Sequence, residues 1–163
     1  MKNKKIQFLN HSAVIAAIYT VLVIVFAPIS FGPVQVRIAE ALTILPYFTP
    51  AAIPGVTIGC FLSAVLTASD PLDIIFGSLA TLIAALLSYG LRRHKFLVPI
   101  PPIVANALII PWVLRYAYDI PDAIPFMMLT VGLGEVISAG ILGTLLLFAL
   151  EPLKPYIFKT DHN

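Results

Sequence analysis

Long apolar runs alternate with short polar breaks along this chain, and almost every charged residue lies in a break. A membrane-crossing helix needs about 20 mostly apolar residues. Read at that length, the pattern predicts six transmembrane helices with approximate bounds 10–29, 38–53, 55–68, 72–91, 96–114 and 123–149. We therefore expect an all-α integral membrane protein with a single domain over residues 1–163.

The composition supports a membrane location. Hydrophobic residues make up 60% of the 163 residues and charged residues 11%, and the mean hydropathy is +0.98. These values lie outside the range of soluble domains. The first apolar run, which ends near Pro28, is too long for a signal-peptide core and lacks a small-residue cleavage site, so we interpret it as a retained helix.

The basic residues predict the orientation. Apart from Arg37 and Arg115, all lysines and arginines fall near the chain ends or between the fourth and fifth predicted helices: Lys2, Lys4, Lys5, Arg92, Arg93, Lys95, Lys154 and Lys159. Basic residues mark the cytoplasmic side of a membrane protein, so both termini are predicted to be cytoplasmic. The net charge of +2 thus indicates orientation and does not indicate nucleic-acid binding.

Two breaks in the pattern are unusual. The segment Phe31–Arg37 (FGPVQVR) is too apolar for a solvated loop, and we predict that it forms an apolar lid between helices 1 and 2 over the outer mouth. Pro46, Pro50 and Pro54 recur at every fourth position, so the second helix is predicted to be bent or broken. Their effect is either to free carbonyls for a ligand or to fit the helix to its neighbours.

The acidic residues of the outer loops include predicted helix caps. Asp70, followed by Pro71 and Asp73, forms a capping-box-like start for the fourth helix. Asp73 has a second interpretation, because a carboxylate at the outer mouth can also pair with a cationic ligand. Asp122 is predicted to cap the sixth helix.

Polar residues inside the apolar runs are the candidate binding residues. Glu135 lies ~20 Å along its helix from Asp122, near the bilayer centre, where an ionisable side chain is costly and usually functional. The alternative is a protonated or arginine-paired structural residue. Asn106, ~13 Å below the outer end of the fifth helix, shares that layer either as a ligand contact or as an interhelical hydrogen bond.

Arg37 and Glu40 are spaced for an ion pair on one helix face, or they form the upper half of a polar pocket. Glu40 and Glu135 reach the same small ligand only if the segment before Glu40 dips inward. The aromatic cluster at the outer end of the fifth helix suits an interfacial belt or stacking on a planar ligand; it comprises Trp112, Tyr116 and Tyr118.

The sequence lacks the motifs of several kinds of enzyme and metal site. The sequence has no Walker P-loop, no His-Glu-x-x-His and no Gly-x-Ser-x-Gly motif. Its single cysteine, Cys60, rules out a disulfide framework, and the three histidines fall near predicted cytoplasmic ends. We therefore expect no enzyme activity, no cofactor and no metal site.

The layout resembles the substrate-binding S component of an energy-coupling factor (ECF) transporter: a small protein with six predicted helices, cytoplasmic termini and an apolar outer lid. Ala13 and Ala17 add a small-xxx-small pattern on the first helix. Four segments further resemble the QueT family of queuosine-precursor transporters: FGPVQVRIAEALTILP from Phe31, DIIFGSLATLIAA from Asp73, ANAL from Ala105 and GLGE from Gly132.

This resemblance implies import of a 7-deazaguanine base, such as 7-aminomethyl-7-deazaguanine or queuine, across a bacterial plasma membrane. The partners it implies are the lipid bilayer, a transmembrane T component contacting Ala13 and Ala17, and two ATPase subunits. It also implies the binding roles. A carboxylate of Glu40 or Glu135 accepts the N–H groups of the guanine-like edge, and Asn106 donates to the ring carbonyl. Tyr47, Trp112 or Tyr116 stacks on the planar base, and the Asp73 carboxylate pairs with the ammonium group of the aminomethyl substituent.

Two alternatives stay open at this point. An S component for another vitamin or nucleobase shares every topological feature, and only the pocket chemistry distinguishes it. An autonomous proton-coupled carrier is the second alternative, with Glu40 and Glu135 as proton-relay groups.

Overall fold

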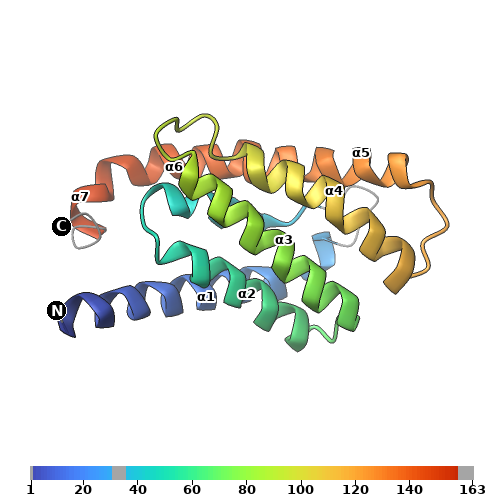
Figure 1. Ribbon diagram of the computed structural model, residues 1–163, viewed down its shortest axis with the longest axis horizontal. Helices are drawn as coiled ribbons and strands as arrows, with labels where there is room; N and C mark the ends of the chain where they lie inside the picture. The colour runs from blue at the N-terminus through green and yellow to red at the C-terminus, as the bar shows by residue number, and fades with distance from the viewer. Residues whose placement is uncertain (1, 31–35, 158–163) are drawn as a thin grey trace.

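The computed structural model describes residues 2–30 and 36–157, and the regular secondary structure of this part of the chain is helical throughout (Figure 1). Most elements are α-helices, whereas η1 and η3 are 3₁₀-helices and η2 is a π-helix. The elements are α1 (Lys2–Ser30), η1 (Ile38–Tyr47), α2 (Ala52–Leu66), α3 (Pro71–Gly90), α4 (Ile100–Ala117), α5 (Ile124–Glu135), η2 (Val136–Leu142), α6 (Gly143–Leu150), η3 (Glu151–Leu153) and α7 (Lys154–Ile157).

Four helical stretches of this part of the chain are long and apolar enough to cross a membrane: Lys4–Pro28, Pro71–Gly90, Ile100–Ala117 and Ile124–Ile157. The last stretch joins α5, η2, α6 and the short helices after it. Two further apolar helices, Ile38–Tyr47 and Ala52–Leu66, are shorter. The all-α prediction is confirmed for the described residues, and the count of six spans stays a prediction.

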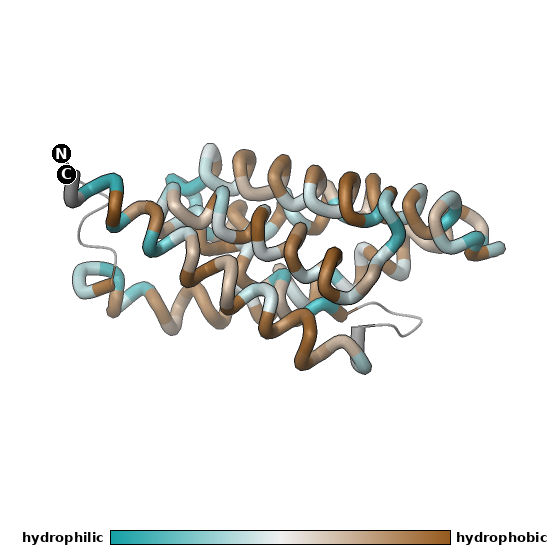
Figure 2. The backbone as a smooth tube through the Cα atoms, turned by 90° about the horizontal axis from the view of Figure 1, so that it is seen from below, coloured by the Kyte–Doolittle hydropathy of each residue, from teal (hydrophilic) through white to brown (hydrophobic). Residues whose placement is uncertain are grey.

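The outward faces of the helices are apolar. Large hydrophobic side chains that are at least 60% exposed occur on α1, α2, α5 and α6 and in the connection from α3 to α4: Leu9, Val25, Leu66, Phe96, Leu129 and Leu145. Figure 2 shows hydrophobic positions along the lengths of the helices and hydrophilic positions chiefly near their ends. An apolar surface of this extent is typical of a protein that faces lipid.

The two ends of the bundle differ in charge. Figure 1 shows the start of α1 and the end of α7 at one end, together with the connection from α3 to α4. We call this the basic end, because its charged residues include Lys4, Lys5, Arg92, Arg93, Lys95 and Lys154. The opposite, acidic end holds the connections from α2 to α3 and from α4 to α5, which carry Asp70, Asp119 and Asp122.

The predicted second helix is broken, as its prolines indicate. Residues 38–47 form η1, and a turn containing Pro50 separates it from α2. Eight residues of η1, Ala39–Pro46, are buried, and η1 packs against α1, α3, α6 and η2. Thus η1 lies inside the bundle, and it carries Glu40 into the interior.

Other local predictions had mixed outcomes. Of the predicted lid, residues 31–35 lie outside the described part of the chain. Asp70 caps α3 as expected, because the Leu72 N–H donates to its Oδ1 at 2.8 Å. The prediction that Asp122 caps the sixth helix was wrong: α5 begins one residue later than a cap there requires, and Pro125 in its first turn has no N–H to donate.

Glycines bring α1 and α2 into close contact. A Cβ atom on Gly59 would lie 2.7 Å from the Tyr19 Cβ and 2.9 Å from the Ala16 carbonyl oxygen, and one on Gly55 would meet α1 in the same way. The Thr20 hydroxyl also donates to the Gly59 carbonyl at 3.2 Å. This contact fixes the inward face of α1, and with it the position of Tyr19.

We expect Gly59→Ala to destabilise the protein by about 1–3 kcal/mol, because overpacking at this distance forces α1 and α2 apart. The midpoint of thermal unfolding in detergent should fall accordingly. Gly90→Ala is the matched control, since a Cβ there has no neighbour within 4 Å. Equal unfolding midpoints for the two variants would contradict this view of the contact.

Candidate binding site

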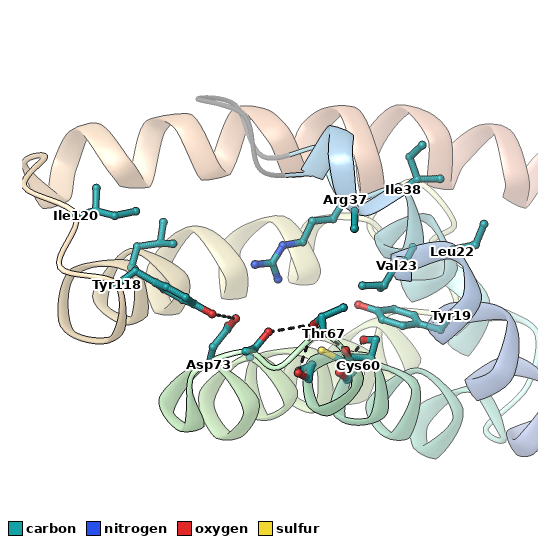
Figure 3. Close-up of a pocket in the computed structure, with 17 residues that line it drawn as sticks. Tyr19, Leu22, Val23, Arg37, Ile38, Cys60, Thr67, Asp73, Tyr118 and Ile120 are labelled. Atoms are coloured by element: carbon teal, nitrogen blue, oxygen red, sulfur yellow. Dashed lines mark hydrogen bonds between the residues drawn. The ribbon is translucent and has the colours of Figure 1, made fainter. Parts of the chain in front are cut away.

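A cavity of about 290 Å³ lies between α1, η1, α2, α3 and the end of α4 (Figure 3). Its apolar walls come from Leu22, Val23, Ile38, Leu114 and Ile120. Its polar groups come from Tyr19, Arg37, Cys60, Ser63, Thr67, Asp73 and Tyr118. The volume is near the lower end of small-molecule pockets, and a mostly apolar wall with a few polar groups is typical of them.

Arg37 extends its guanidinium into the middle of this cavity, as Figure 3 shows. The charges of Asp73 and Glu40 act on it, yet no carboxylate of residues 36–157 lies within 4.0 Å of its nitrogens. The ion pair that sequence spacing allows between Arg37 and Glu40 is therefore not formed. The guanidinium is available to a ligand.

Asp73 and Tyr118 meet at the acidic end of the cavity. The Tyr118 hydroxyl donates to Asp73 Oδ2 at 2.9 Å and accepts from the Asp70 N–H at 3.3 Å. Burial raises the pKa of the Tyr118 phenol above its ordinary value, and the Asp73 charge adds to this. The hydroxyl therefore keeps its proton at neutral pH and holds the carboxylate in place.

Tyr19 closes the other side of the cavity. It projects from α1, is 2% exposed, and its hydroxyl donates to Glu40 Oε1 at 2.7 Å. Tyr19 was not among the residues predicted from the sequence, although a tyrosine within an otherwise apolar run next to small residues was a usable signal. Through this hydrogen bond, the cavity adjoins the polar interior around Glu40.

Four polar side chains gather in that interior, and we call them the polar cluster: Glu40, Asn106, Glu135 and Ser138. None is more than 2% exposed. The Asn106 side chain lies near both carboxyl groups, so the interior path of η1 brings Glu40 and Glu135 together. Glu135 ends α5, and Ser138 lies in the π-helix η2, a rare geometry that is frequent at functional sites.

The polar cluster is incompletely satisfied. One atom of each side chain has no hydrogen-bond partner among the described residues: Glu40 Oε2, Asn106 Nδ2, Glu135 Oε2 and Ser138 Oγ. Buried polar atoms in folded proteins almost always have partners. The cluster thus offers unused acceptors and an unused donor at one place.

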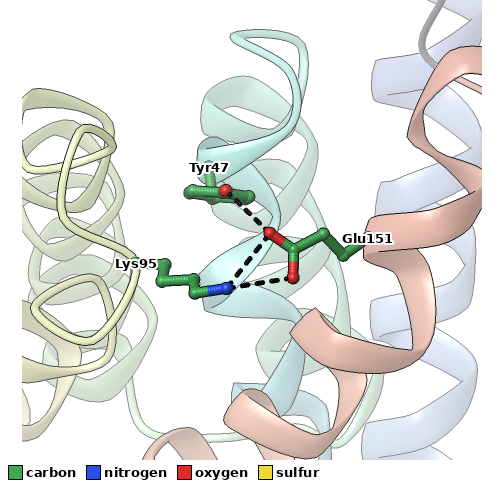
Figure 4. A network of polar contacts seen from close by, with 3 residues as sticks. All are labelled: Tyr47, Lys95 and Glu151. Atoms are coloured by element: carbon green, nitrogen blue, oxygen red, sulfur yellow. Dashed lines mark hydrogen bonds and ion pairs between the residues drawn. The ribbon is translucent and has the colours of Figure 1, made fainter.

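Three predicted stacking residues lie outside the cavity. Tyr47 is at the basic end, where its hydroxyl donates to Glu151 Oε1 at 3.4 Å; Lys95 Nζ lies 3.2 Å from Glu151 Oε2 (Figure 4). Trp112 and Tyr116 are 46% and 68% exposed and stack on each other, with centroids 6.4 Å apart. The rings that do line the cavity belong to Tyr19 and Tyr118.

The remaining predicted residues divide into two groups. Arg37 and Asp73 line the cavity, and Glu40, Asn106 and Glu135 form most of the polar cluster. The predicted partner-contact residues are elsewhere: both alanines of the small-xxx-small pattern, Ala13 and Ala17, are exposed on α1.

We expect Tyr19→Phe to lower the unfolding free energy by about 1–3 kcal/mol, because it leaves Glu40 Oε1 buried without its donor. The measurement is thermal unfolding in detergent. Tyr116→Phe removes a hydroxyl at an exposed position and serves as the control. If the two variants unfold at the same temperature, the Tyr19 hydroxyl does not stabilise the buried carboxylate.

Comparison with known proteins places this chain in a family. No solved structure matches the chain. "Queuosine precursor transporter QueT" from Lactococcus lactis subsp. cremoris (strain MG1363) is 37% identical over 85 residues, which is 51% of this chain and 50% of the relative. The match therefore spans about half the length of that relative. The family model described as QueT transporter matches residues 9–152, a range that contains both the cavity and the polar cluster, and the chain belongs to this family.

Proposed function

We propose that this protein is the substrate-binding S component of an ECF-type importer for a queuosine precursor, a 7-deazaguanine base such as 7-aminomethyl-7-deazaguanine or queuine. Family membership and the name of the Lactococcus lactis relative support this. The observation that carries the proposal is the polar cluster with its unpartnered buried atoms, which the hydrogen bond between Tyr19 and Glu40 links to the wall of a cavity of small-molecule size.

The chemistry of the polar cluster suits the edge of such a base. The guanine-like edge presents N–H donors beside a ring carbonyl. The carboxyl oxygens of Glu40 and Glu135 accept from N–H groups, and Asn106 Nδ2 donates to a carbonyl. These bonds are strong in a dry interior, where unpaired polar atoms are costly. A bound base therefore supplies hydrogen-bond partners for these atoms.

Tyr19 lies between the cavity and the polar cluster. A base in the cavity reaches Glu40 when the Tyr19 ring shifts and its hydroxyl gives up Glu40 Oε1. The rings of Tyr19 and Tyr118 then pack against the planar bicycle. They take the role that the sequence analysis assigned to other aromatic residues.

The charge distribution supports the orientation. With the basic end in the cytoplasm, both termini are cytoplasmic and the cavity lies at the outer side of a bacterial plasma membrane. The sequence has no nucleotide-binding motif, so the energy comes from two separate ATPase subunits through a transmembrane T component. The exposed Ala13 and Ala17 give α1 a smooth face for close contact with that component.

The function is tested by equilibrium binding of 7-aminomethyl-7-deazaguanine, queuine, guanine and riboflavin to the purified protein in detergent. We expect tight binding of a deazaguanine and a loss of about 10- to 100-fold in affinity in Glu135→Gln, which replaces an acceptor oxygen by a donor. Glu151→Gln, at the basic end, is the control and should bind normally. Tight binding of another ligand, without deazaguanine binding, would refute the substrate.

The partner face is tested by replacing Ala13 and Ala17 together by leucine. We expect cellular uptake to be lost while ligand affinity is unchanged, because the bulky side chains block helix contact outside the binding site. Ala149→Leu, at an exposed position on α6, is the control. Preserved uptake would refute the role of α1.

Uptake by the protein alone in ATP-free vesicles, driven by a proton gradient, would instead favour the proton-coupled carrier.

A further inference from the structure

Asp73 has one oxygen engaged and one available. Its Oδ2 accepts from Tyr118, whereas Oδ1 accepts no hydrogen bond from the residues that the structure describes. The carboxylate lies beside Gly77, one turn further along α3, since a Cβ on Gly77 would be 3.2 Å from Oδ1. Both residues line the cavity. The free oxygen is therefore placed for a ligand at the acidic end.

Tyr118, at the end of α4, fixes this arrangement of Asp73. It follows α4 directly, and its hydroxyl bridges the Asp73 carboxylate and the backbone N–H of Asp70, the residue that caps α3. The carboxylate is thus held at the start of α3 with its second oxygen beside Gly77, which also lines the cavity. Tyr118 acts as a positioning residue for Asp73.

The charges around the cavity favour a cationic ligand. Arg37 and Asp73 offset each other. Glu40 lies behind Tyr19, and Glu135 lies near Glu40. Acidic side chains therefore outnumber basic ones around the cavity, an arrangement that favours a cationic ligand.

The shape of the ligand matches the positions of these groups. In a 7-deazaguanine, the N–H donors lie on the six-membered ring, whereas the substituent at C7 projects from the five-membered ring. Figure 3 shows Tyr19 on one side of the cavity and Asp73 with Tyr118 on the other. When the N–H edge meets the polar cluster behind Tyr19, the C7 substituent points toward Asp73.

We propose that Asp73, positioned by Tyr118, is an ammonium-binding subsite that selects 7-deazaguanines with a protonated amine on the C7 substituent over neutral ones. The inference rests on the proposed function and narrows its substrate class. It assigns Asp73 to specificity and Tyr118 to the positioning of Asp73. The polar cluster then binds the base, and Asp73 at the acidic end binds the C7 substituent.

The test compares the affinities of 7-aminomethyl- and 7-cyano-7-deazaguanine, which share the base and differ in charge, by titration calorimetry in detergent. We expect the wild-type protein to prefer the aminomethyl compound by about 10- to 100-fold, the range of a hydrogen bond between charged groups. Asp73→Asn should remove the preference, because it should lower the affinity for the aminomethyl compound and leave the affinity for the cyano compound unchanged. Tyr118→Phe should reduce the preference in part.

Two further variants separate recognition from general effects. Asp122→Asn makes the same charge change at an exposed position of the acidic end and should keep the full preference. Gly77→Ala displaces Asp73 Oδ1 without a charge change and should reduce the preference; alanine also favours the helix, so this variant should fold.

The outcomes distinguish this inference from the proposed function. Equal wild-type affinities for the two compounds, or an unchanged preference in Asp73→Asn and Gly77→Ala, would overturn the ammonium subsite while the base-binding function stands. Failure of both compounds to bind the wild-type protein would overturn the proposed function and the subsite together.

Discussion

The hydrogen bond from Tyr19 to Glu40 joins the outer helix α1 to η1, a helical segment buried inside the bundle. Neither water nor lipid can satisfy a carboxyl group there, so the protein must supply the partners. Among the residues that the structure describes, a donor is present for one oxygen of Glu40 and none for the other. The close contact of α1 with Gly59 fixes Tyr19, and Tyr19 in turn sets where the cavity ends and where the polar cluster begins.

The sequence predicted well those features that depend on local chemistry. The helical membrane character followed from apolar runs, the break after η1 from its prolines, and the Asp70 cap from the residue order. Glu40, Asn106 and Glu135 were selected because polar groups inside apolar runs are costly. The structure then showed that these three lie together, which depth along separate helices could not establish.

Features that depend on three-dimensional packing were not predictable. An apolar run does not distinguish a helix in lipid from one buried in protein, so the interior position of η1 did not follow from its composition. Aromatic residues suit an interfacial belt and a ligand wall equally. For that reason Trp112 and Tyr116 were selected although they face outward, while Tyr19 was missed.

The central claim is that a deazaguanine occupies the cavity beside the polar cluster, and Cys60 offers the most direct test. It is the only cysteine of the chain and it lines the cavity. We expect saturating 7-aminomethyl-7-deazaguanine to slow alkylation of Cys60 by a small thiol reagent, with the protection lost in Glu135→Gln at the same concentration. An unchanged alkylation rate while the ligand is demonstrably bound would place the ligand elsewhere and contradict the claim.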